Sequence, residues 1–369
     1  MSSEGINSPD QGSTGDYPAP REPELSPVRE WLKRHLAGRM LAAVRRRRKV
    51  PLLALRAVWA EREDLRAGRI PPVPRDRHPK CRAVVCIPAG PGDPAALFDT
   101  IDSVLASDRG ESQIVVIDDC SVSCREAIVR ARYPEVDVVR TRVPSGGPPN
   151  LWPVLRTAVR HVLEHYDFEL FARLDTDALV TGPDFCERAL ERLSGAPEVG
   201  IGGSFRTRAD GRPEGHEFHV AVLDRELPRD ATLKRGVERA EAAGWRRGDA
   251  VQGGVMFMTR EACERLRSEG WLDWRRPWHS IAAEDLALTV FVRACGLNAL
   301  SLGGPEDLFL AVANKGLPLA KEELAERPWV AAHSVRVGLH GEREAELRQF
   351  FRGHRASWPV PSPHRTEPT

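Results

Sequence analysis

The strongest constraint on the fold is an alternation of short apolar runs with helical segments, which begins near residue 81. The runs "RAVVCIPA" (82–89) and "SQIVVIDD" (112–119) are rich in β-branched residues and stop at turn-forming residues. Between them, the apolar residues of "DPAALFDTIDSVLAS" (93–107) recur at helical spacing. The pattern predicts a strand, a helix and a second strand.

The same alternation continues further along the chain. The run "DVVRTRV" (137–143) predicts a third strand, residues 152–165 predict a helix, and "FELFARL" (168–174) predicts a fourth strand. Strands that alternate with helices at this spacing favour a mostly parallel sheet with helices on both faces. The predicted fold class is therefore α/β, Rossmann-like, with a helical extension before it.

The two ends of the chain differ in composition from this region. Residues 1–25 are rich in Ser, Gly, Pro, Asp and Glu, and they predict a disordered tail. Residues 26–70 predict a basic helical extension, in which the first amphipathic helix ends in "RRRRK" (45–49). Residues 341–369 predict a C-terminal helix followed by a Pro-rich tail.

Two hypotheses account for the basic helical extension. Its charged face is either solvated while the other face packs on the rest of the chain, or it docks on an anionic membrane surface through residues 26–60. The helix also carries acidic residues, and the tail before it is acidic. We therefore favour the solvated face over the membrane contact.

Composition narrows the class of protein. The 54 basic and 53 acidic residues give a net charge of +1, which does not favour a nucleic-acid partner. The 7 cysteines form no Cys-x-x-Cys pair and no zinc-ligand spacing, as expected for a reduced, intracellular protein. Since the sequence has neither an apolar stretch of about 18 residues nor a secretory signal at its start, we expect a cytoplasmic protein, with peripheral membrane association as the alternative.

Carboxylates follow two of the predicted strands. Asp118 and Asp119 end the second strand, and Asp175 and Asp177 come directly after the fourth. Ligands of parallel sheets bind beyond the carboxyl ends of the strands, where such residues meet. An Asp-x-Asp pair at a strand-to-loop transition can hold a divalent cation, and Mg²⁺ or Mn²⁺ suits these hard oxygen ligands.

Five segments together carry a resemblance to a known family: "VVCIPA", "IVVIDDCS", "ARLDTDALV", "QGGVMFMTREACERL" and "AEDLAL". They occur in the order and approximate spacing of the GT-A fold nucleotide-sugar glycosyltransferases, and they look most like the inverting glycosyltransferase family 2. The resemblance covers residues 81–340 and leaves out the N-terminal helices.

The resemblance implies a nucleotide pocket at the ends of the first two strands. Ile87, Pro88 and Ala89 line this pocket in the matching positions, and Asp119, together with Asp118, contacts the base or the ribose. The alternative is that the acidic pair only caps the following turn.

The resemblance also implies a metal and diphosphate site. Asp175 and Asp177 reach the ribose and the metal-bound diphosphate of the donor, and His333 matches a third metal ligand. Arg336, in the same segment as His333, faces the diphosphate. The alternatives are a solvated turn for the two aspartates and a packing role for the histidine.

An acidic pair further along matches the catalytic base of the family. The resemblance assigns this role to Asp285, with Glu284 as the second candidate, while a simple helix cap is the alternative. Trp271, Trp274 and Trp278 precede the pair and either stack on the acceptor or, as we favour, pack in the core.

The predicted function is metal-dependent transfer of a sugar from a nucleoside diphosphate-sugar to an acceptor hydroxyl or amine, with inversion. A nucleotidyltransferase of related fold is one alternative, although "IPAGPGDPAAL" (87–97) lacks the basic residue usual in its phosphate loop. A non-catalytic sugar-nucleotide sensor or scaffold, whose N-terminal helices bind a partner, is the other.

Overall fold

The fold is known from a computed structural model, and every residue that it describes belongs to one compact unit, Leu53–Thr369. The predicted disordered tail, the basic helical extension and the Pro-rich tail lie outside the described residues. The structure describes residues 80–358 except 109, 111, 120–124, 142–150, 197, 214–215 and 275–279.

The first half of the fold confirms the predicted alternation of strands and helices. Helix α3 begins where expected because the Asp93 side chain caps it by accepting from the backbone N–H of Ala95 at 2.9 Å, and Pro94 occupies its first turn. The elements in order are β1 (Ala83–Ala89), α3 (Pro94–Ser107), β2 (Ser112–Asp118), α4 (Arg125–Arg132), β3 (Asp137–Arg140), α5 (Trp152–His165) and β4 (Leu170–Leu174).

The second half adds further strands and helices. None of the helices described is both long and apolar enough to cross a membrane. The elements are β5 (Ala178–Val180), α6 (Phe185–Ser194), β6 (Val199–Phe205), α7 (His216–Glu226), α8 (Ala231–Ala242), β7 (Val251–Thr259), α9 (Arg260–Ser268), α10 (Glu284–Ala294), β8 (Asn298–Ser301), β9 (Leu310–Val312), α11 (Lys321–Glu326), β10 (Ala331–His333) and α12 (Glu344–Arg355), with single 3₁₀ turns at Leu227–Arg229 and Trp271–Asp273.

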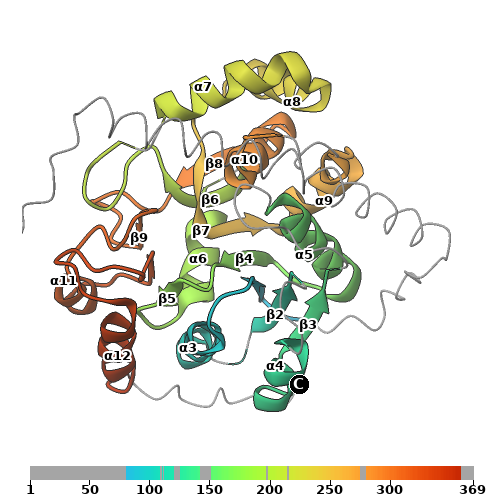
Figure 1. The fold of residues 1–369 in the computed structure, drawn as a ribbon. Helices are drawn as coiled ribbons and strands as arrows, with labels where there is room; N and C mark the ends of the chain where they lie inside the picture. The colour runs from blue at the N-terminus through green and yellow to red at the C-terminus, as the bar shows by residue number, and fades with distance from the viewer. Residues whose placement is uncertain are drawn as a thin grey trace, which may run out of the picture. The chain divides into compact units, whose positions relative to one another are not determined.

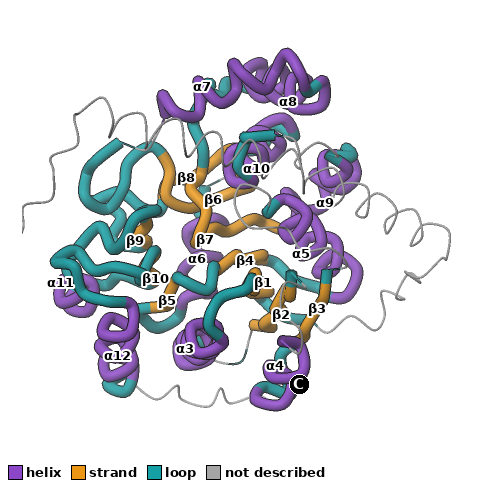
Figure 2. The backbone as a smooth tube through the Cα atoms, in the orientation of Figure 1, coloured by secondary structure: helices purple, strands orange, loops and turns teal. Residues whose placement is uncertain are grey.

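A seven-stranded sheet, in the order β3-β2-β1-β4-β7-β6-β8, forms the centre of the fold (Figure 2). Its pairs are parallel except those that β7 makes with β4 and β6. In the register, Ala89 lies opposite Asp118, and Cys86 lies opposite Arg173. The carboxyl ends of β1, β2 and β4 therefore share one edge, as the sequence predicts.

A second sheet of three short strands, in the order β5-β10-β9, lies beside this edge. Strand β5 begins only four residues after the end of β4, so the chain passes from one sheet to the other through the Asp175–Asp177 turn. Strand β10 pairs with β5 in the antiparallel direction and places His333 opposite Ala178. This pairing brings a histidine from late in the chain next to the turn.

Two clusters of the core pack on the large sheet, one on each face. On β1, Val84 and Cys86 belong to the cluster that contains residues of α5, α9 and α10, whereas Ala83, Val85 and Ile87 belong to the cluster that contains residues of α3, α4 and α6. Figure 1 shows α5, α9 and α10 on one side of the sheet and α3 and α4 on the other. Alternate side chains of a strand point to opposite faces, so these helices cover both faces, as expected.

Aromatic packing holds helix α10 against helix α5 and against the segment that contains Trp271 and Trp274. Phe291 is fully buried, and its ring centroid lies 5.4 Å from that of Trp152 and 5.0 Å from that of Trp271. Trp274 is also buried, with its ring centroid 5.6 Å from that of Phe291. Trp271 and Trp274 are therefore packing residues, while Trp278 lies outside the described residues.

This packing makes a prediction about stability. Phe291→Ala should lower the free energy of unfolding by about 3–5 kcal/mol, because it leaves a cavity among large rings. Phe218→Ala is the control, since this side chain is 67% exposed and its loss should change the free energy by no more than about 0.5 kcal/mol. Urea unfolding of both variants measures the difference, and equal losses would contradict the packing described.

Candidate functional site

The structure brings Asp175, Asp177 and His333 together into one cluster. Each offers one ligand atom, and these atoms lie within 4.8 Å of one another. Asp175 follows β4 of the large sheet, Asp177 precedes β5 of the small sheet, and His333 ends β10. The cluster therefore forms where the two sheets meet, from residues far apart in the sequence.

A buried arginine orients the first of these aspartates. Arg173, on β4, donates from Nε to Asp175 Oδ1 at 2.8 Å and from Nη2 to Asp175 Oδ2 at 3.1 Å. Its Nη2 also lies 2.9 Å from Glu284 Oε1. One guanidinium thus links the candidate metal cluster to the candidate catalytic pair.

The sequence reasoning missed Arg173. The available signal was a cation within the apolar run "FELFARL", because a strand buried on both faces accommodates an arginine only where carboxylates neutralise it. Burial lowers the pKa of Arg173, but the charges of Asp175 and Glu284 outweigh that effect and raise it above its usual range. Arg173 is therefore a permanent positive charge at the centre of the site.

Asp177 is surrounded by hydrogen-bond donors. It accepts from Ser334 Oγ at 2.8 Å and is paired with Arg336 Nε at 2.9 Å, while His333 Nε2 lies 3.4 Å from its other oxygen. Burial alone raises the pKa of the Asp177 carboxyl. The interaction with His333, the hydrogen bond from Ser334 and the charge of Arg336 outweigh burial and hold the pKa well below its usual range, so Asp177 is ionised. Sequence reasoning also missed Ser334.

The imidazole of His333 is packed against a glycine. Gly254, on β7, has a φ of +94°, and a Cβ built on it would come within 2.6 Å of the His333 ring. Within the part of the chain that the structure describes, Nδ1 of this buried histidine has no hydrogen-bond partner. A glycine is required here for two reasons, the backbone conformation and the space that the ring occupies.

The cluster has the donor chemistry of a divalent cation site. Two carboxylates and an imidazole suit Mn²⁺, and Mg²⁺ accepts the same oxygen ligands. Ligands at about 2.1 Å from one cation are separated from each other by about 3–4 Å. The 3.4 Å between His333 Nε2 and Asp177 Oδ1 falls in this range, and all three ligand atoms lie within 4.8 Å of one another. The residues present therefore fit such an ion.

The acidic pair lies at the start of helix α10, and its two members lie in different environments. Glu284 is buried and paired with Arg173, whereas Asp285 is partly exposed. Asp285 accepts from the backbone N–H of Gly253 at 3.2 Å and of Leu286 at 2.7 Å. Burial raises the pKa of Glu284, and the neighbouring carboxylates add to this shift while Arg173 opposes it.

The residues expected around a nucleotide lie at the same sheet edge but on neighbouring strands. Asp118 and Asp119 are both buried at the end of β2, and the Asp119 N–H donates to Ala89 O at 3.1 Å. The Ile87 side chain is fully buried in the core, while Pro88 is partly exposed. Adjacent strands are about 4.8 Å apart, so the ends of β2 and β4 are separated by about 10 Å across β1.

Comparison with known proteins gives a fold-level similarity only. No protein-family model matches the chain, and neither does any curated protein. Among solved structures, the mannosyltransferase PcManGT from Pyrobaculum calidifontis, in complex with GDP-Man and Mn²⁺, is 20% identical with a TM-score of 0.37, over 68% of this chain and 66% of that chain. S. aureus TarS 1-349 is 14% identical with a TM-score of 0.37, over 60% of this chain and 58% of that chain.

A structure of the same TarS segment with UDP is 13% identical with a TM-score of 0.36, over 60% of this chain and 58% of that chain. The chain thus spans less than two thirds of the length of these proteins. At these scores the similarity is one of chain path, and it assigns no role to any residue of this chain.

The glycine beneath the imidazole provides a test of this geometry. Gly254→Ala should destabilise the protein more than Gly270→Ala, which has a similar φ of +77° but no atom within 4 Å of the added methyl group. Gly270→Ala should cost about 1–2 kcal/mol of strain, and Gly254→Ala about 1–3 kcal/mol more, because its methyl group must displace the His333 ring. Urea unfolding gives both values, and equal losses would exclude this ring position.

Proposed function

We propose that the chain is a metal-dependent glycosyltransferase that moves a sugar from a nucleoside diphosphate-sugar to an acceptor hydroxyl or amine. The observation that carries the proposal is the convergence, at one sheet edge, of a carboxylate–imidazole cluster and a second acidic pair, with Arg173 joining them. The five sequence segments that resemble GT-A glycosyltransferases support the same assignment.

Asp175, Asp177 and His333 are the residues that would hold Mn²⁺ or Mg²⁺. When bound, the cation would neutralise charge on the departing diphosphate, a Lewis-acid effect of several kcal/mol. Arg336 is well placed to add to this effect, since its side chain is 68% exposed and already lies beside Asp177. A guanidinium matches the geometry of phosphate oxygens better than an ammonium does.

The nucleoside would extend from the metal cluster across β1 towards β2. Asp119, together with Asp118, would accept hydrogen bonds from the base or ribose, and the backbone of Ile87, Pro88 and Ala89 would line the pocket. The separation of about 10 Å between the ends of β2 and β4 suits a ligand with a base at one end and a diphosphate at the other. Buried carboxylates at strand ends support a polar ligand there.

Asp285 is the better candidate for the base that takes the acceptor proton. Glu284 is buried and already engaged by Arg173, whereas Asp285 is partly exposed. A base must reach the proton that it abstracts, which a partly exposed carboxylate can do. Proton removal by Asp285 lets the acceptor attack the anomeric carbon opposite the leaving diphosphate, so the configuration inverts.

The metal and donor assignments are tested together by calorimetry. The parent protein should bind at least one nucleoside diphosphate in the presence of Mn²⁺, and Asp177→Ala should abolish this binding while the protein remains folded. His333→Ala should weaken the binding less, because two carboxylates and the diphosphate remain as ligands. Release of nucleoside diphosphate from a sugar nucleotide would confirm the reaction class, whereas release of pyrophosphate from nucleoside triphosphates would contradict it.

A second test separates catalysis from binding. Asp285→Asn keeps the size of the side chain but cannot take a proton, so it should bind donor and Mn²⁺ like the parent and lose transfer by about 10²- to 10⁴-fold. Glu284→Gln should lose less of the transfer activity. Initial rates at saturating donor measure both variants, and an active Asp285→Asn beside an inactive Glu284→Gln would reverse the assignment.

A further inference from the structure

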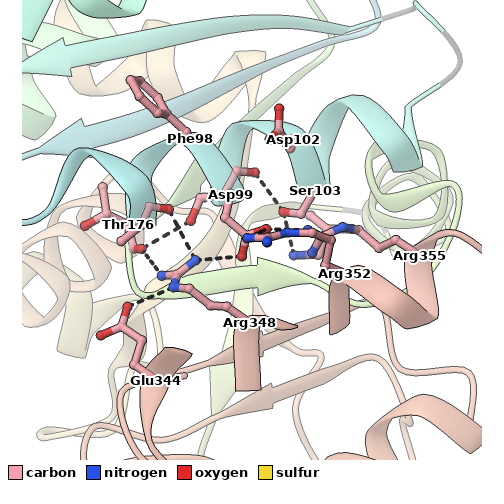
Figure 3. A network of polar contacts seen from close by, with 12 residues as sticks. Phe98, Asp99, Asp102, Ser103, Thr176, Glu344, Arg348, Arg352 and Arg355 are labelled. Atoms are coloured by element: carbon pink, nitrogen blue, oxygen red, sulfur yellow. Dashed lines mark hydrogen bonds and ion pairs between the residues drawn. The ribbon is translucent and has the colours of Figure 1, made fainter. Parts of the chain in front are cut away.

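Helix α12 carries three arginines that converge on one buried carboxylate of helix α3 (Figure 3). Arg348, Arg352 and Arg355 recur at a spacing of four and three residues, which places them on one face of the helix. Their common partner is Asp99, which is only 2% exposed. Arg348 Nη1 lies 3.2 Å from Asp99 Oδ2, Arg352 Nη2 lies 3.5 Å from Oδ1, and Arg355 Nη2 also donates to Oδ1.

Arg348 differs from the other two because its contacts extend beyond Asp99. Its Nη2 donates to the backbone carbonyl of Thr176 at 2.6 Å, and its Nη1 donates to the carbonyl of Ala96 at 3.2 Å. Its Nε donates to Glu344 Oε1 at 2.9 Å, one helical turn earlier. With every nitrogen of the planar group held by an acceptor, the N–H that meets Thr176 has a fixed position.

Thr176 is the central residue of the Asp175-Thr176-Asp177 turn. Besides Arg348, its carbonyl accepts from Thr100 Oγ1 of helix α3 at 3.2 Å, and the same hydroxyl lies 3.0 Å from Ala178 O. A peptide unit is planar, so fixing this carbonyl also fixes the amide that begins Asp177. The contact therefore restricts the direction in which the aspartates present their carboxylates.

We propose that Arg348 is a positioning residue for the metal cluster: it holds the Thr176 carbonyl from helix α12 and so orients Asp175 and Asp177 for the cation. The inference rests on the proposed function. Arg348 touches neither ligand atom, and it acts through the backbone of the turn. Outer-shell partners of metal ligands typically contribute 10- to 100-fold to metal affinity.

A purely structural role for Arg348, in which it only ties α12 to α3, is separated from positioning by a matched control. Arg355 is buried and binds the same Asp99 carboxylate, and within the described part of the chain its side chain makes no hydrogen bond to Thr176. Arg348→Gln and Arg355→Gln each remove one charge from the same carboxylate. Only the first removes the contact with the turn.

The experiment is a Mn²⁺ titration of the full chain, followed by the electron paramagnetic resonance signal of free Mn²⁺, with UDP and GDP as nucleotide probes. Arg348→Gln should weaken Mn²⁺ binding about 10-fold or more, while Arg355→Gln should stay within about 2-fold of the parent. Thr100→Val removes the hydroxyl that the carbonyls of Thr176 and Ala178 share, without a change of charge, and it should weaken Mn²⁺ binding in the same direction. Thermal unfolding of each variant reports separately on stability.

The possible outcomes differ for the inference and for the proposed function. If the parent bound no Mn²⁺, or if Asp177→Ala bound Mn²⁺ as well as the parent does, the proposed function would fail, and the inference with it. If the parent bound Mn²⁺ through Asp177 but folded Arg348→Gln matched the parent, or fell only as far as Arg355→Gln, the inference alone would be overturned. Should Arg348→Gln not fold, unchanged Mn²⁺ affinity in Thr100→Val would overturn it.

Discussion

The site depends on one buried guanidinium. Arg173 stands between Asp175 and Glu284, with its Nη2 2.9 Å from the glutamate and its Nε 2.8 Å from the aspartate. A buried charge is tolerated only when its partners are in place, and loss of one partner typically costs about 3–5 kcal/mol because the remaining charge is uncompensated. The three residues therefore form a unit in which neither acidic group can shift without the arginine.

The remaining site geometry follows from the way the chain leaves the large sheet. The turn after β4 passes directly into β5 of the small sheet, so its two aspartates are held at both ends by strands that belong to different sheets. Strand β10, which pairs with β5, then supplies His333. Movement of the turn would therefore disturb the hydrogen-bonded ladders on either side of it.

The sequence predicts the local part of this structure well and the tertiary part poorly. Strands such as β1 and β2 are long apolar runs bounded by turn residues, so hydrophobic periodicity locates them. Strands β5 and β10 contain only three residues each, too few to show any period, and their pairing depends on contacts across about 150 residues of sequence. The role of Arg348 could not be predicted either, because its partners are known only after folding. Arg173 left a signal, a cation within the buried run of β4, but the sequence did not identify the carboxylates that pair with it. His333 was expected from family resemblance alone.

The contact between Gly254 and His333 links two positions that lie far apart in the sequence. The imidazole occupies the space in which a side chain at position 254 would lie, at 2.6 Å from a Cβ built there. Related chains with a larger residue at the position of Gly254 would need a smaller one, or a displaced ring, at the position of His333. The two positions should therefore vary together, and a chain that keeps the Asp-x-Asp pair but changes either of them has lost or rebuilt the contact between ring and glycine.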